Sequence, residues 1–400
     1  MNIRMKRLWR LLPVLLMFAL LHGCSTLGPA RTVDGKVPLN KAVTELPDEQ
    51  LLDIWVELFD PGKLPEDEDK ALGLSMEIRA AEARYLPEQL RATMESTGYW
   101  GAVRVVPQDT TGHELRVSGT ILESDGQRLV LEITALDATG REWFRRTYRE
   151  EIEHAQYLKG GQDGSEVFQS LYNTIANDLA EYRAKLDVTE TLAIRRVAAL
   201  RFAADLAPDT FAGYLEEDKG RFRVVHLPSE DDPMYGRVLA IRDRDSLLID
   251  TLNGHFDNFT RTMQPPYTEW RKARSEEAEA LRELEKDALQ RKLLGVAAIL
   301  GAIAVEASSD NGSGSGVLRD VLVLGGAYAI KSGFDKSSET DIHRDAIIEL
   351  DESFSSEAGP MVVEVEGETH ELTGSAEVQY AQWRALLKRI YAAETGLAGS

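Results

Sequence analysis

Few side chains in this sequence are spaced for chemistry. The seven histidines are His22, His113, His154, His226, His255, His343 and His370. No two of them stand at metal-ligand spacing, and there is no second cysteine beside Cys24. The glycine–serine run at 312–316 lacks the lysine of a phosphate-binding loop, and no G-x-S-x-G nucleophile motif occurs. The sequence therefore predicts no cofactor, no metal site and no catalytic residue, and it indicates a protein that is not an enzyme.

The first 23 residues have the three parts of a secretory signal. Four basic residues precede an apolar run from Leu11 to Leu21, which is too short to span a membrane. Small Gly23 lies directly before Cys24. We therefore expect residues 1–23 to be a signal peptide that is cleaved after Gly23. Because Cys24 is the only cysteine, no disulfide within the chain can stabilise the fold.

The tetrapeptide Leu21-His22-Gly23-Cys24 resembles the lipobox of bacterial lipoproteins. This resemblance implies that Cys24 is lipidated, and two or three acyl chains hold a protein firmly to a bilayer. By the sorting rule of that family, Ser25 implies the periplasmic face of the outer membrane of a Gram-negative bacterium. His22 departs from the pattern, since a small or β-branched residue is usual there. The alternative is an ordinary signal peptide with an incidental cysteine.

The composition is globular but strongly acidic. Hydrophobic residues make up 43% of the chain, and the net charge is −21. This charge argues against nucleic acid and against anionic lipid heads, because both select basic patches. We expect a protein partner or self-association, besides the membrane reached through the lipid, and no small-molecule substrate is evident. Residues 24–45 lack a hydrophobic period and are interpreted as the lipidated cysteine and a tether.

Residues 46–186 are predicted to form an α/β (α+β) domain. Alternating apolar residues predict strands at 52–58, 103–105, 115–121, 129–135 and 143–148. Helices are expected at 71–83, from Pro87 to Gly98, and at 167–182. This order of elements predicts helices that cover a mostly antiparallel sheet.

The first domain resembles a periplasmic domain that several envelope proteins share. The resemblance rests on the helix–glycine–aromatic–"VVP" step at 90–107, on "ELRVSGTI" at 114–121 and on "ALDATGREW" at 135–143. The related groups are curli-secretion (CsgG-type) lipoproteins, lipoprotein activators of peptidoglycan synthases and the amino-terminal domain of TolB-type proteins. The resemblance implies a docking or ring-forming module without chemistry. The alternative is an unrelated α/β domain with the same order of elements.

The second half is predicted to be mainly helical. Segment 187–265 carries an amphipathic helix that ends before Pro265-Pro266, and residues 213–228 echo residues 90–107, which we interpret as chance. In region 266–334 a long charged helix leads into an apolar block at 293–305. A glycine–serine loop at 308–316 separates this block from a second one at 321–330.

Small residues recur at four-residue spacing in and just beyond the two apolar blocks. They are Ala297, Gly301, Gly325, Ala329 and Gly333. This spacing lets helices pack closely, in a membrane or in a soluble pair. Because a membrane span takes about twenty apolar residues, we favour a buried helical hairpin or an oligomer interface over insertion into the bilayer. Shallow contact with the nearby leaflet is a further alternative.

Residues 335–400 are predicted to form a β-hairpin around a turn at 366–368, followed by a final helix. Two aromatic pairs, Tyr99 with Trp100 and Tyr267 with Trp270, are candidate partner-binding residues. Burial in the core is the alternative for these four side chains.

These features predict a non-enzymatic outer-membrane lipoprotein. Its expected role is that of a structural, adaptor or oligomeric component in a cell-envelope assembly or secretion process. Two alternatives are a regulator of a peptidoglycan synthase and an enzyme that acts on envelope glycan or lipid.

Overall fold

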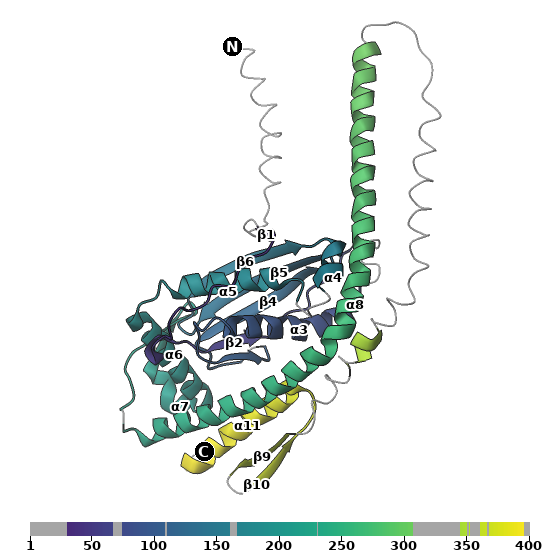
Figure 1. Ribbon diagram of the computed structural model, residues 1–400. Coiled ribbons are helices and arrows are strands. Elements are labelled where there is room, and N and C mark those ends of the chain that lie inside the picture. Colours follow the sequence, from purple (N-terminus) through teal and green to yellow (C-terminus); the bar gives the residue numbers. More distant parts are fainter. Residues whose placement is uncertain are drawn as a thin grey trace, which may run out of the picture.

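A computed structural model describes most of the chain. The described residues are 30–66, 74–108, 110–160, 166–229, 231–306, 345–349, 352, 361–365 and 368–395. Among them, a six-stranded sheet is packed against helices, and helix α8 (Pro233–Glu306) runs along this body and then extends away from it (Figure 1). The predicted α/β class is therefore confirmed. Cys24, Gly23, Gly325, Ala329 and Gly333 lie outside the described residues.

The sheet is mixed, which corrects the prediction of a mostly antiparallel sheet. Its strands are β1 (Arg31–Val33), β2 (Ile54–Glu57), β3 (Val103–Val106), β4 (Leu115–Ser124), β5 (Arg128–Asp137) and β6 (Glu142–Glu151), in the order β1-β6-β5-β4-β2-β3. The long strands β4, β5 and β6 form the predicted antiparallel meander, whereas β1, β2 and β3 each join in parallel. Strand patterns in a sequence show that strands exist but not their direction.

Part of the predicted tether belongs to the body. Residues 31–33 form the edge strand β1 beside β6, and the next residues lie along helix α5 (Gln169–Arg183). There the Asn173 side chain donates to the Val37 carbonyl at 2.8 Å, and the Asn177 side chain accepts from the Asn40 amide at 2.8 Å. A three-residue edge strand followed by a segment that side-chain amides hold needs no hydrophobic period, which explains why the sequence pattern missed both.

Helix α3 (Met76–Glu95) runs through Pro87, where a new helix was expected to start. An interior proline cannot donate to the carbonyl four residues earlier, which here belongs to Ala83. The backbone N–H of Phe59, just after β2, donates to that carbonyl at 2.9 Å. The sheet thus satisfies the acceptor that Pro87 frees, so one continuous helix forms.

Buried apolar residues on both faces of β2 join the sheet to two groups of helices. Ile54 and Val56 belong to a core with α3 and α5, and Trp55 belongs to a second core on the opposite face. That second core contains residues of α6 (Val188–Leu206), α7 (Pro208–Phe211), α8 and α11 (Ala376–Thr395). A strand that is buried on both faces is typical of the parallel part of an α/β sheet.

Helix α8 also passes through two prolines at which it was expected to end. It contains Pro265 and Pro266, and it is bent in Figure 1. Interior prolines are the usual cause of helix kinks, because each removes a backbone hydrogen bond. Before these prolines in α8, Asn253 donates to the carbonyl and accepts from the amide of Val105, at 2.8 and 2.7 Å. This contact covers the exposed edge of the sheet at β3.

The remaining elements are short, apart from α11. Residues 213–228 contain the end of η2 (Ala212–Tyr214) and a hairpin of β7 (Leu215–Asp218) and β8 (Arg221–Val224). They therefore do not repeat the helix–strand step of residues 90–107, which their sequence echoes. The predicted carboxyl-terminal hairpin is confirmed as β9 (Met361–Val365) and β10 (Glu368–Leu372), followed by α11. The others are η1 (Asp48–Gln50) and α4 (His154–Gly160). Over the described part of the chain, no helix is both long and apolar enough to cross a membrane.

A buried carboxyl group joins β6 to the start of α5. Glu150 accepts a hydrogen bond from the Leu171 amide at 2.8 Å. Burial raises the pKa of Glu150 from 4.5 to about 7, and the neighbouring carboxylate of Glu166 adds to the rise. The folded state therefore holds this proton more tightly than the unfolded state does. The resulting stabilisation is present in full below about pH 4.5 and is lost as the pH rises through 7.

We therefore expect Glu150→Gln to gain stability over the wild type as the pH increases. The amide keeps an acceptor for Leu171 but cannot ionise, so the difference in unfolding free energy should grow by about 3 kcal/mol between pH 4.5 and pH 8. Urea unfolding at a series of pH values measures this difference. Parallel stability curves for the two proteins would contradict the assignment.

Candidate functional site

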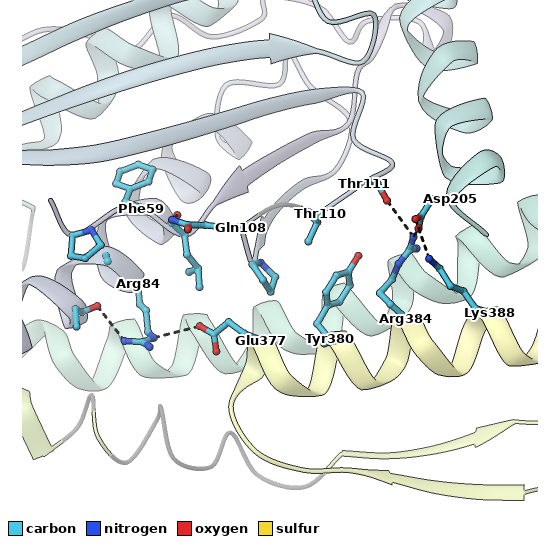
Figure 2. Close-up of a pocket in the computed structure, with 16 residues that line it drawn as sticks. Phe59, Arg84, Gln108, Thr110, Thr111, Asp205, Glu377, Tyr380, Arg384 and Lys388 are labelled. Carbon is cyan, nitrogen blue, oxygen red and sulfur yellow. Dashed lines mark hydrogen bonds and ion pairs between the residues drawn. The ribbon is translucent and has the colours of Figure 1, made fainter. Parts of the chain in front are cut away.

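A cleft of about 640 Å³ lies between the sheet and α11 (Figure 2). One wall consists of residues that follow the parallel strands β2 and β3, namely Leu58, Phe59, Pro61, Pro107, Gln108, Thr110 and Thr111. Ala80, Ala83 and Arg84 of α3 also line the cleft. Ligand sites in α/β proteins occur preferentially at the carboxyl ends of parallel strands. The cleft therefore lies where this fold places a binding site.

One face of α11 forms the opposite wall. Its lining residues are Glu377, Tyr380, Ala381, Arg384 and Lys388. They recur every three or four positions, so they share one side of the helix. Figure 2 shows the polar ones in a row along α11, facing the loops that follow β2 and β3.

Ion pairs occupy both ends of this row. At one end, Glu377 Oε1 lies 3.8 Å from Arg84 Nε. At the other end, Asp205 of α6 binds both Lys388, at 3.1 Å, and Arg384. Arg384 also contacts Asp245 of α8 at 3.2 Å, so three helices meet at its guanidinium.

The charges at the Arg384 end are strongly coupled. Burial raises the pKa of Asp245 to about 6, even though Arg384 acts against the rise. Burial also opposes the charge of Arg384, but the carboxylates of Asp245 and Asp205 raise its pKa above the ordinary value. Lys388 and Arg384 together hold the pKa of Asp205 below its usual range despite partial burial. This end of the cleft is therefore fixed in place by charge-assisted contacts.

The middle of the cleft combines apolar surface with hydroxyl groups. Phe59 and Ala83 contribute apolar surface, and Thr111 Oγ1 accepts from Arg384 at 3.3 Å. Thr110 and Tyr380 point toward one another in Figure 2. Thr110 is only 8% exposed, and its hydroxyl has no hydrogen-bond partner among the described residues.

The carboxylates of the cleft do not form a pair suited to glycoside hydrolysis. The two carboxylates that line the cleft, Glu377 and Asp205, lie at its opposite ends. Asp205 binds Lys388, which is about 16 Å from Glu377 along α11. The carboxyl groups of a glycosidase lie within about 10 Å of each other. Elsewhere, burial lowers the pKa of His113 to about 3, and this side chain is therefore neutral. Within the described ranges, no three histidine, cysteine, aspartate or glutamate side chains are grouped to hold a metal ion.

Three of the four predicted partner-binding aromatics lie inside the protein. Trp100 packs near Trp143, with ring centroids 6.4 Å apart, and Tyr267 stacks on Trp270 at 5.8 Å. Trp100, Tyr267 and Trp270 are buried, and Tyr99 is half-buried against the same core. Burial in the core, the alternative interpretation of these residues, therefore describes Trp100, Tyr267 and Trp270.

Tyr267 and Trp270 instead fasten α8 to the body. The neighbouring Arg271 forms a bidentate ion pair with Glu166, at 2.6 and 3.0 Å, and lies 4.2 Å from the ring of Tyr267. The Tyr267 hydroxyl donates to Glu82 of α3 at 2.7 Å. Further along, Arg282 binds Asp125 and Gln127 at the β4–β5 turn. These contacts position the part of α8 that then leaves the body.

Ala297 and Gly301 lie in that outer part of α8, so the first apolar block is helical as expected. The second block, and with it the predicted helical hairpin, lies outside the described residues.

Sequence reasoning missed the cleft. Its residues come from stretches near positions 60, 84, 110, 205 and 380, and only the fold brings them together. One local signal was present in α11, where charged or polar residues at 377, 380, 384 and 388 form a second stripe beside the apolar one. Such a stripe also fits a solvent-exposed face, so it does not identify a site by itself.

No family model, curated protein or solved structure matches this chain. Function must therefore be inferred from its own residues.

Proposed function

We propose that this protein is a non-enzymatic, lipid-anchored adaptor on the periplasmic face of the outer membrane. In this proposal the α/β body holds the outer part of α8 (residues 283–306) as an arm, and the arm binds an envelope protein or a second copy of the chain. The observation that supports it most is that α8 leaves the body as a continuous helix (Figure 1).

The arm is long and its root is rigid. From Arg282, which contacts the β4–β5 turn, the helix continues to Glu306, a length of about 36 Å. Isolated helices of this size are marginal in water, so most helices in proteins are stabilised by packing. The apolar run at 293–305 supplies a surface for such packing. A helix that carries an apolar run beyond its own body is suited to binding another helix or protein.

The lipid anchor would keep the body close to one leaflet. Because the edge strand β1 begins at Arg31, the chain between Cys24 and Arg31 can span at most about 25 Å. This reach is shorter than the tether of residues 24–45 expected from the sequence. A short reach favours an adaptor at the outer membrane over a regulator that must cross the periplasm to a peptidoglycan synthase.

The anchor is tested by Cys24→Ser. We expect this variant to move from the membrane fraction to the soluble periplasmic fraction, because it cannot carry the lipid. Fractionation followed by immunoblotting measures the shift, with Ser25→Ala as the matched control that should stay at the membrane. If Cys24→Ser stays at the membrane after a salt wash, the apolar blocks form a second anchor.

The arm is tested by photo-crosslinking in intact cells. A photoreactive amino acid at Ile299 or Ile303 should give a discrete adduct, either a dimer of the chain or a complex with one envelope protein. The same probe at Leu247, an exposed position on the part of α8 that lies along the body, is the control. Only monomer at the arm positions, or the same adducts at all three positions, would contradict the proposal.

A further inference from the structure

We propose that the cleft beside α11 binds a short peptide in an extended conformation, with its free carboxyl end at Lys388 and its amino end at Glu377. This inference goes beyond the proposed adaptor function, because it depends neither on the arm nor on the lipid anchor. It rests on the length of the cleft, the charges at its two ends and the chemistry of its middle.

The length of the cleft fits about five extended residues. Glu377 and Lys388 are eleven positions apart on α11, which corresponds to about 16 Å of helix. An extended chain advances about 3.3 Å per residue, so five residues cover this distance. The loops after β2 and β3 face this stretch of α11 and leave the space between them open (Figure 2).

The charged groups at the ends differ in what they can offer a ligand. Arg384 is engaged by Asp205, Asp245 and Thr111, and its side chain is 13% exposed. Lys388 is 47% exposed and binds Asp205, which leaves N–H donors for a carboxylate because an ammonium group has three. Glu377 is partly exposed and lies 3.8 Å from Arg84, which is too long for a hydrogen bond. Its carboxylate can therefore accept from an amine.

The middle of the cleft selects a peptide over other ligands with a carboxylate. Phe59, Ala83 and Ala381 provide apolar contacts for side chains. The buried hydroxyl of Thr110 lacks a partner in the described structure, and a peptide backbone would supply one. A fatty acid would satisfy Lys388 but would offer no amine to Glu377 and no polar group to the Thr110 hydroxyl. A neutral oligosaccharide would offer no charged group to Lys388 or to Glu377.

The test uses the full chain, solubilised in detergent, and two pools of random apolar pentapeptides. One pool has free carboxyl ends and the other has amidated ends. Rapid gel filtration followed by mass spectrometry measures the peptides that the protein retains. We expect the free-carboxyl pool to be retained about tenfold better than the amidated pool, because the contact with Lys388 is charge-assisted.

Two variants and one control make the test specific. Lys388→Gln should remove the preference for free carboxyl ends, and Ala381→Trp should fill the cleft and abolish retention of both pools. Arg389→Gln alters the next residue of α11, which is exposed and does not line the cleft, and should behave like the wild type. Thermal unfolding shows whether each variant is folded.

The proposal is overturned if the folded wild type retains neither pool, or both pools equally. It is also overturned if Lys388→Gln and Arg389→Gln keep the same preference. Retention of palmitate or of a chito-oligosaccharide without any peptide would assign the cleft to a different ligand class. None of these results bears on the crosslinking of the arm, so the two proposals can fail separately.

Discussion

Replacing Arg271 with methionine is expected to destabilise the protein by about 3–5 kcal/mol, because it leaves the buried carboxylate of Glu166 without its partner. Both side chains are almost completely buried, and the pair is bidentate. Although burial opposes ionisation, Arg271 holds the pKa of Glu166 below its usual range. Urea unfolding followed by circular dichroism measures the loss at pH 7.

Two further variants separate the ion pair from the loss of a long side chain. Lys272→Met changes the next residue, whose exposed contact with Glu269 is 3.3 Å, and should cost less than about 1 kcal/mol. Adding Glu166→Gln to Arg271→Met should restore part of the stability, because no buried charge is then left unpaired. Arg271→Met alone should also be less damaging near pH 4, where Glu166 can take up a proton. Equal losses for Arg271→Met and Lys272→Met would show that the pair does not fasten α8.

The sequence predicted those parts of the fold that local chemistry determines. The β4–β5 turn is an example, because Asp125 Oδ1 accepts from the amides of Gln127 and Arg128, at 2.9 and 2.7 Å, and Gly126 has a φ of +87°. These contacts join neighbours in the chain, so the local Ser-Asp-Gly sequence at 124–126 is enough to specify the turn between the two predicted strands. The carboxyl-terminal hairpin and α11 were predicted for the same reason.

The prediction failed where a distant segment changes the local preference. Pro87 was expected to start a helix, but the Phe59 amide satisfies the carbonyl that this proline frees. Residues 37–40 were expected to be part of a tether, but side chains of α5 bind their backbone. The cleft was missed on the same grounds, since Arg84, Asp205 and Lys388 line one cleft only after the sheet and three helices have packed.

Gly126→Ala is expected to weaken the contact between α8 and the β4–β5 turn. An added Cβ would lie 2.5 Å from the Arg271 carbonyl oxygen and 2.9 Å from Arg274 Cβ, and the backbone at this position has the left-handed φ that favours glycine. The left-handed conformation costs about 1–2 kcal/mol with a side chain, and overpacking against α8 adds about 1–3 kcal/mol. We therefore expect a total loss of about 2–5 kcal/mol in urea unfolding, together with faster trypsin cleavage in α8.

Gly35→Ala is the matched control for the part of the stability loss that comes from the left-handed backbone. Gly35 has a similar φ of +73°, but an added Cβ there meets no atom within 4 Å. This variant should lose only the backbone part, about 1–2 kcal/mol, and should leave the trypsin sites of α8 protected. The difference between the two glycine variants therefore measures how tightly α8 is held at the turn. If the two losses are equal, α8 moves away from the turn at little cost, and an arm with a rigid root is no longer supported.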